Sequence, residues 1–393
     1  MASTLTGFPR RPTLYTLSAY IFSQSQFVRE EEFSDGPEFI TTSFRVALGM
    51  GLHRKLEEAG FTATEQETRR RLWWYILHLD VMSSCSSGLS PLYVDEKMGN
   101  SPAISTTDLL EHVRGSGQGS VQLRLPDIRY VVAKVRYETT KVIRGILLGH
   151  FEEHFTSLEA VSETASSIES LGETVKTAID RILQVGSKLS RHELLEIYQS
   201  ENLAVPEGAS TINDTWRVDA SESRSHVVGF AIWATSLLHL MLHKAYCILY
   251  FPLAKDQHSD FGADIRLTAI KHAQAFLQLF IRVCDAPFSS PFHWMYPGTY
   301  QPLQAMSLLL ADLLNFPHSD EAPTSQGLVD AIFDLYQVDQ GMITASDPPR
   351  RRLSPSGREV WSMLGRLRNK AFEQMDQDPH VVLPTFIASS HSR

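Results

Sequence analysis

The chain has 393 residues, 43% of them hydrophobic, so it can bury a large core and is not a disordered protein. It carries 36 Lys and Arg against 45 Asp and Glu, a formal net charge of −9. Direct DNA binding usually needs a basic surplus, because neutralising phosphates supplies most of the affinity. The charge balance therefore argues against direct DNA binding.

The three cysteines, Cys85, Cys247 and Cys284, are far apart and lie among apolar neighbours. A structural zinc site needs clustered thiolates or imidazoles at short spacings, and a secreted disulfide framework needs paired cysteines. We therefore expect no metal or cofactor in this chain and a reducing compartment.

Apolar residues repeat at helical spacing along most of the chain, and no segment alternates in the way that predicts a strand. The expected fold is all-α, a multi-helix array of packed antiparallel helices in a single large domain. Residues 13–345 form this domain, between a disordered 1–12 and a C-terminal tail, 346–393, with one helix. Helices are expected at about residues 13–32, 38–52, 65–84, 126–155, 175–189, 223–250, 264–284, 299–314, 325–337 and 360–372.

The third of these helices has the most distinctive sequence. Thr62 or Thr64 can cap its start, and Glu65 and Glu67 are favourably placed near its positive end. Apolar residues then cover much of its circumference as far as Ser84, which predicts a central position with other helices packed around it.

The most apolar segment, 227–253, has the length of a membrane-spanning helix. His239, His243 and Lys244 interrupt it near its middle, which favours a buried core helix and no membrane. The polar stretch 205–219, rich in Pro, Gly and Asn, is the best candidate for an internal linker.

Four short stretches occur in a fixed order in the first quarter of the chain. They are Ala-Leu-Gly-Met-Gly-Leu-His-Arg at 47–54, Glu-Thr-Arg-Arg-Arg-Leu-Trp-Trp at 67–74, Leu-Asp at 79–80 and Gly-Leu-Ser-Pro at 88–91. Their order and spacing resemble the fungal-specific transcription factor domain, the middle homology region of zinc-cluster regulators. The resemblance continues more loosely to about residue 340. Val81 and Ser90 depart from it, since the family often has a basic residue at the first position and Arg at the second.

The resemblance implies a nuclear regulatory domain that controls RNA polymerase II transcription, responds to a small-molecule effector and is not an enzyme. It marks a structural signature of ten residues: Gly51, Leu52, His53, Arg54, Arg69, Arg70, Arg71, Trp73, Trp74 and Asp80. The family's six-cysteine zinc cluster is missing from this sequence, through truncation of the gene model or in a naturally cluster-less relative. DNA would then be reached only through the missing cluster or a partner's cluster, and the expected protein partners are other transcription regulators or a second copy. The alternatives are a helical scaffold or dominant-negative partner of full-length regulators, and an unrecognised helical enzyme.

Three groups of polar residues have a functional and a structural interpretation. Arg69 to Arg71 could touch DNA or a partner, but pairing with Glu65, Glu67 or Asp80, or stacking on aromatic rings, is the favoured interpretation. His239 and His243 lie one helical turn apart, but no third metal ligand is evident. Ser354 follows two arginines and precedes a proline, which makes it a candidate phosphorylation site.

Overall fold

The computed structural model describes residues 7–25, 36–54, 60–92, 125–151, 158–186, 224–252, 263–285, 292, 302–344 and 351–376. The expected all-α fold is confirmed across these residues. The helices are α1 (Leu14–Ser25), α2 (Gly36–Gly49), α3 (Ala63–Ser87), α5 (Leu125–Phe151), α6 (Leu158–Gly186), α8 (Arg224–Tyr250), α9 (Ala263–Asp285), α11 (Leu303–Asn315), α12 (Ala322–Tyr336) and α13 (Pro355–Met375). The predicted linker at 205–219 lies outside the described residues.

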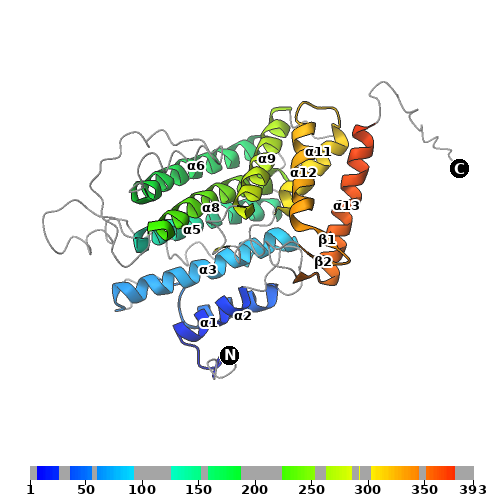
Figure 1. The fold of residues 1–393 in the computed structure, drawn as a ribbon. Coiled ribbons are helices and arrows are strands. Elements are labelled where there is room, and N and C mark those ends of the chain that lie inside the picture. The colour runs from blue at the N-terminus through cyan, green and yellow to red at the C-terminus, as the bar shows by residue number, and fades with distance from the viewer. Residues whose placement is uncertain are drawn as a thin grey trace.

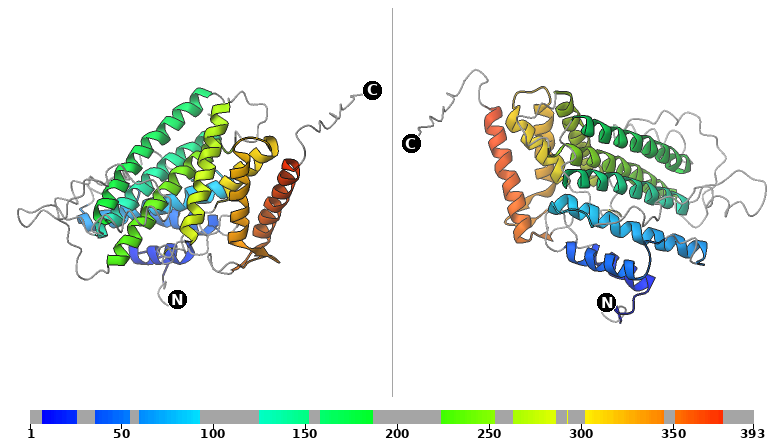
Figure 2. Two further views of the ribbon diagram at one scale, coloured as in Figure 1. Left: turned by 45° about the horizontal axis from the view of Figure 1, so that its top comes forward. Right: turned by 180° about the vertical axis from the view of Figure 1, so that it is seen from behind.

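Helix α8 is the centre of the larger part of the fold. It packs against α5, α6, α9 and α11, and its segment Gly229–Tyr250 is apolar and long enough to cross a membrane. However, 83% of the most apolar stretch of this segment is buried inside the protein, as in the core helix of a globular domain. Figures 1 and 2 show α8 enclosed by its neighbours. The structure therefore confirms the prediction that this segment is a buried core helix.

Helix α3 joins the N-terminal helices to the rest of the molecule. It packs against α1 and α2 on one side and α5 on the other, and Figure 1 shows it between the α1–α2 pair and the main body. Its residues from Leu72 to Leu79 belong to a hydrophobic cluster with α1 and α2. Val81 and Met82, one turn further on, belong to a second cluster with α5, α6 and α8. The helix is therefore buried on opposite faces, as its apolar circumference predicted.

Helix α6 begins well before the predicted residue 175. Its first half is rich in Ser and Thr, yet Val161, Ile168 and Leu171 continue the apolar repeat and are buried. The hydroxyls on its outer face bond back along the helix, for example from Ser166 Oγ to the Ser162 carbonyl at 3.0 Å. These bonds satisfy polar side chains within the helix, so the polar composition did not prevent helix formation.

A small antiparallel sheet, which the sequence did not predict, lies between α12 and α13. Its strands β1 (Val338–Asp339), β2 (Met342–Ile343) and β3 (Arg351–Arg352) pair in that order. Gln340 and Gly341 both have positive φ, 45° and 76°, which is the conformation of a two-residue type I′ hairpin turn. Two-residue strands are too short to show an alternating pattern, and this explains why the sequence did not reveal them.

Both ends of the helical body differ from the predicted boundaries. Residues 7–12 were expected to be disordered, but Phe8 packs against Tyr20 with 4.7 Å between ring centroids. At the other end, α13 was assigned to a tail, but Trp361 and Leu364 lie in the main hydrophobic core and α13 packs against α11. The helical body therefore includes α13, because its inward face is apolar.

Candidate functional site

Gly51 and Leu52 of the predicted signature terminate helix α2. Gly51 has a left-handed φ of 71°, its N–H donates to the Leu48 carbonyl at 3.0 Å, and the Leu52 N–H donates to the Ala47 carbonyl at 3.0 Å. This pair of bonds is the Schellman motif, in which glycine supplies the left-handed residue at little cost. The turn then directs Leu52 into the N-terminal hydrophobic cluster, where it is fully buried. These two residues therefore have a structural role.

His53 follows this turn and lies beside Trp73, with 6.0 Å between ring centroids. Partial burial, and then the nearby charge of Arg54, lower the pKa of the His53 imidazole. Arg54 itself is exposed, so it is the signature residue of this turn that solvent reaches most easily.

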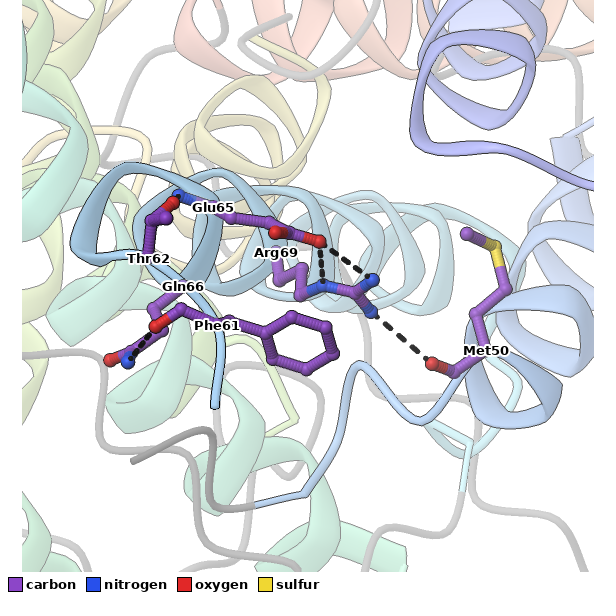
Figure 3. A network of polar contacts seen from close by, with 6 residues as sticks. All are labelled: Met50, Phe61, Thr62, Glu65, Gln66 and Arg69. Atoms are coloured by element: carbon purple, nitrogen blue, oxygen red, sulfur yellow. Dashed lines mark hydrogen bonds and ion pairs between the residues drawn. The ribbon is translucent and has the colours of Figure 1, made fainter. Parts of the chain in front are cut away.

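Arg69 connects the start of α3 to the end of α2 (Figure 3). Its Nε and Nη2 atoms donate to Glu65 Oε1 at 3.3 and 3.1 Å, and its Nη1 donates to the Met50 carbonyl at 3.4 Å. Its guanidinium carbon lies 3.9 Å from the centroid of the Phe61 ring. The side chain thus uses an ion pair, a backbone contact and a cation–π contact to hold two helices together.

The capping residues of α3 hold this network in place. The Thr62 hydroxyl accepts a hydrogen bond from the Glu65 N–H at 3.3 Å, which confirms Thr62 as the N-cap. Gln66 Nε2 donates to the Phe61 carbonyl at 2.9 Å (Figure 3). Together these bonds fix the segment that carries the Phe61 ring beneath Arg69.

Arg70 and Arg71 share Glu67 as an ion-pair partner within α3. Arg70 Nη1 lies 3.1 Å from Glu67 Oε2, and Arg71 Nε lies 2.5 Å from Glu67 Oε1. Arg70 is buried, whereas 44% of the Arg71 side chain is exposed. The Tyr137 hydroxyl of α5 also donates to the Arg71 carbonyl at 3.1 Å. The three arginines are therefore paired with Glu65 and Glu67.

The two tryptophans face different neighbours across α3. Trp73 is only 1% exposed and stacks on Phe44 of α2, with 5.4 Å between centroids. Trp74 lies 6.3 Å from the ring of Tyr137 on α5. Consecutive residues of a helix point about 100° apart, so two adjacent large rings can fill both interfaces of α3.

Asp80 secures the chain after α3 ends. Gly88, with a φ of 67°, terminates the helix, and the chain then returns so that the Leu92 N–H donates to the Asp80 carboxylate at 2.9 Å. Arg144 of α5 donates to the Leu92 carbonyl at 3.0 Å. Burial raises the pKa of Asp80 to about 6, although the Leu92 hydrogen bond and the Arg144 charge act in the opposite direction. Asp80 thus links α3, the Gly-Leu-Ser-Pro segment and α5.

Val81 occupies a position where the family often has a basic residue. It is fully buried in the cluster that contains residues of α5, α6 and α8. An unpaired charge would be costly there, so the apolar residue suits this packing.

A buried polar network that the sequence did not reveal lies next to the signature. His78 Nδ1 lies 2.9 Å from the Thr140 hydroxyl, and Arg136 Nε donates to His78 Nε2 at 3.0 Å. Because Nε2 accepts, the imidazole is neutral with its proton on Nδ1. Burial, then the charges of Arg136 and Lys244, lower the pKa of His78 well below 6.5. His78 appears in the sequence as one polar position on an apolar helix, and only the fold brings α5 to it.

The histidines of α8 form a pair with α9. His243 Nδ1 lies 2.9 Å from His272 Nδ1. The Tyr246 ring stacks on the His272 ring, with 3.7 Å between ring centroids. Burial lowers the pKa of His243 to about 3 and that of His272 to about 4. Within the described ranges, no group of three His, Cys, Asp or Glu side chains could hold a metal ion. No disulfide joins Cys85, Cys247 and Cys284 to one another.

Ser354 is the N-cap of α13. Its hydroxyl accepts a hydrogen bond from the Gly357 N–H at 3.0 Å and lies 3.1 Å from the Ser356 hydroxyl. The preceding residue, Leu353, is buried and its N–H donates to the Gly341 carbonyl at 2.9 Å. A kinase that binds its substrate in an extended conformation would have to break these contacts to reach the Ser354 hydroxyl. Phosphorylation of Ser354 stays a prediction.

Comparison with known proteins identifies the domain around α3. Residues 15–102 match the fungal specific transcription factor domain. The chain carries a fungal-specific transcription factor domain. The match spans α1, α2, α3 and the segment clamped by Asp80, so the signature residues lie inside it.

Similarity to known transcription factors extends along most of the chain. The transcription factor macR of Penicillium terrestre is 24% identical over 378 residues, 94% of this chain and 42% of macR. The transcription factor yanR of Aspergillus niger is 28% identical over 182 residues, 44% of this chain and 22% of yanR. The C6 finger domain transcription factor hasF of Aspergillus fumigatus is 33% identical over 92 residues, 23% of this chain and 12% of hasF. The chain therefore spans less than half the length of these relatives, and no solved structure matches it.

Proposed function

We propose that this chain is the regulatory body of a fungal transcription regulator that acts on RNA polymerase II transcription in the nucleus. The observation that carries the proposal is the domain match over residues 15–102, together with similarity to macR along 94% of the chain. The contacts of the signature support a framework role, because Arg69, Arg70 and Arg71 are each paired with a carboxylate on their own helix.

In this proposal a zinc cluster outside the described fold reads the DNA, either in another part of the polypeptide or in a partner regulator. The relative hasF is named a C6 finger domain transcription factor, which is consistent with such a cluster in a relative. The net charge of −9 also disfavours direct phosphate binding by this chain.

We further propose that this chain binds a small-molecule effector, and one buried side chain supports this. Trp233 of α8 is packed against Phe230 and Phe292, with ring centroids 5.5 and 4.3 Å away. Its indole Nε1 is buried and has no hydrogen-bond partner among the described residues. An unpaired buried donor costs about 1–3 kcal/mol, which a ligand with an acceptor oxygen would recover. Such a ligand would regulate by binding one conformation better than another. Trp233→Phe, which keeps the ring and removes the donor, should weaken thermal stabilisation by an effector.

A tethering assay tests the main proposal. The full chain is fused to an unrelated DNA-binding domain, and transcription of a reporter carrying the matching sites is measured in a fungal host. We expect the fusion to change reporter transcription relative to the DNA-binding domain alone, in either direction. A well-expressed fusion that leaves transcription unchanged would refute the regulatory role.

The same assay separates the scaffold alternative. A dominant-negative partner would leave the tethered reporter unchanged, yet co-purify with a zinc-cluster regulator and lower that regulator's output. An enzyme would instead show turnover in a metabolite screen.

A further inference from the structure

Two arginines bring positive charge to the start of helix α13. Arg358 is exposed, and its Nη1 atom donates to the Leu353 carbonyl at 2.9 Å. Arg352 of β3 is also exposed. In the part of the chain that the structure describes, neither arginine forms an ion pair, although the chain carries a net charge of −9. The positive end of the α13 dipole adds to these two charges.

The Ser354 hydroxyl lies on the same side of the chain as Arg352. Ser354 is extended, with φ −63° and ψ 168°, and Leu353 before it is buried. Alternate residues of an extended segment point to the same side, so Arg352 and Ser354 face outward while Leu353 faces the core. Arg358 approaches from the other direction, since it bonds to the Leu353 carbonyl. The hydroxyl is therefore within reach of two guanidinium groups.

We propose that Ser354 is phosphorylated in the folded chain and that Arg352 and Arg358 hold the phosphate, which fastens the start of α13 to the small sheet. A phosphoserine carries a charge of about −1.5 to −2 at pH 7 and three strong acceptor oxygens. Guanidinium groups bind phosphate through paired hydrogen bonds, and a helix N-terminus favours an anion. The modification therefore adds attraction at a place where positive charge has no carboxylate partner among the described residues.

The Arg358 side chain connects this site to the sheet. It crosses directly over Gly341 in the turn between β1 and β2 and leaves no room for a Cβ atom there. The Leu353 N–H also donates to the Gly341 carbonyl at 2.9 Å. Figure 1 shows the sheet beside the end of α13 where the helix begins. A phosphate that holds Arg358 in place therefore ties α13 to the turn, and removal of the phosphate releases the tie.

A kinase needs only a local opening to reach the hydroxyl. Residues 351–354 are already extended, and β3 is an edge strand. Unwinding the first turn of α13 breaks the bonds that the Gly357 and Arg358 N–H groups donate to Ser354. Helix ends open at the low end of the free-energy range of local unfolding. Trp361, one turn further on, lies in the main hydrophobic core and holds the rest of α13 in place.

The sequence around Ser354 indicates the class of kinase. Pro355 has no backbone N–H, so the enzyme must accept proline directly after the serine. Ser90, Ser101 and Ser290 also precede proline, but arginines two and three residues before the serine occur only at Ser354. The Ser354 Oγ attacks the γ-phosphorus of ATP, so that a new P–O bond forms while the bond to ADP breaks. The hydroxyl proton passes to the catalytic base of the kinase.

The first experiment tests the modification of the full chain. The probe is a proline-directed serine kinase that phosphorylates a synthetic peptide of residues 348–360 in the presence of ATP. Mass spectrometry should find phosphate on Ser354 of the folded chain, and this site should be lost in Ser354→Ala. A kinase that modifies the peptide but leaves Ser354 of the folded chain unmodified would overturn the proposal.

The second experiment tests how the phosphate is held. Hydrogen exchange of the amides at 356–360 is compared between the full chain and the same chain with phosphoserine incorporated at position 354 alone. The phosphate should slow this exchange roughly tenfold, because it adds charge-assisted hydrogen bonds at the helix N-terminus. In Arg352→Gln/Arg358→Gln the slowing should shrink to less than about threefold, since only the helix N-terminus then attracts the phosphate. Arg366→Gln, at an exposed position of the same helix, should keep the full effect.

Comparing modified and unmodified forms within each variant removes any effect of the substitution on folding. Unchanged or faster exchange in the modified native chain would show that the phosphate does not fasten α13. Slowing of equal size in Arg352→Gln/Arg358→Gln would show that these arginines do not hold it.

Discussion

The carboxylate of Asp80 accepts a hydrogen bond from the Leu92 N–H at 2.9 Å, while Arg144 donates to the carbonyl of the same residue. The carboxylate and the guanidinium therefore fix the path of the chain after α3 through the N–H and the carbonyl of one residue. Burial is the largest influence on this carboxylate, and it raises the Asp80 pKa from 3.8 to about 6. The strength of this contact after α3 therefore depends on pH, through the protonation of Asp80.

Asp80→Asn isolates this coupling. A pKa raised in the folded state means that Asp80 stabilises the fold most below pH 3.8 and loses this contribution as the pH rises through about 6. The free energy of unfolding of the native chain, minus that of Asp80→Asn, should therefore fall by about 2 kcal/mol between pH 4 and pH 7. Urea unfolding at a series of pH values measures the difference, and a difference independent of pH would contradict the assigned environment.

His78 should make an opposite contribution to the pH dependence. Its pKa is lowered in the folded state, so unfolding takes up a proton, and stability is lost as the pH falls below 6.5. His78→Gln, which can keep one hydrogen bond to Thr140 or Arg136, should reduce this acid sensitivity. Chemical unfolding of both proteins between pH 7 and pH 5 tests this, and equal acid sensitivity of the two would count against a buried neutral imidazole.

Arg69→Met should cost about 1–2 kcal/mol of unfolding free energy, because it removes the Glu65 pair, the Met50 contact and the Phe61 stacking together. Arg71→Met is the matched control on the same helix. Its side chain is 44% exposed, so its ion pair with Glu67 should contribute less than about 1 kcal/mol. Equal losses for the two variants would show that the α2 contact contributes nothing.

Ser354→Ala should lower the unfolding free energy by about 1 kcal/mol, because the hydroxyl caps α13. Ser354→Asp should retain most of the stability, since a carboxylate can accept the same Gly357 N–H. Ser362→Ala, at an exposed position of α13, serves as the control. If Ser354→Ala proves as stable as the native chain, capping is not the function of this hydroxyl.

Long apolar repeats made most of the helices predictable from the sequence. The Thr62 cap, the core position of α8 and the burial of the paired tryptophans follow from local patterns, and the structure shows each of them. The start of α6 was missed because its many Ser and Thr residues obscure the apolar repeat of Val161, Ile168 and Leu171, and the two-residue strands were missed because they are too short to show alternation. The partners of Asp80 and His78 were missed because Leu92, Arg144 and Arg136 reach them only after folding.

Hydrogen–deuterium exchange of the α3 backbone tests the central claim most directly, since the structural account of the signature requires α3 to be a buried framework helix. Exchange between Arg69 and Asp80 should be among the slowest in the chain, comparable with the middle of α8 and much slower than in α1. If the amides of this segment exchange as fast as those of α1, then α3 is not the element that joins the N-terminal helices to the main body.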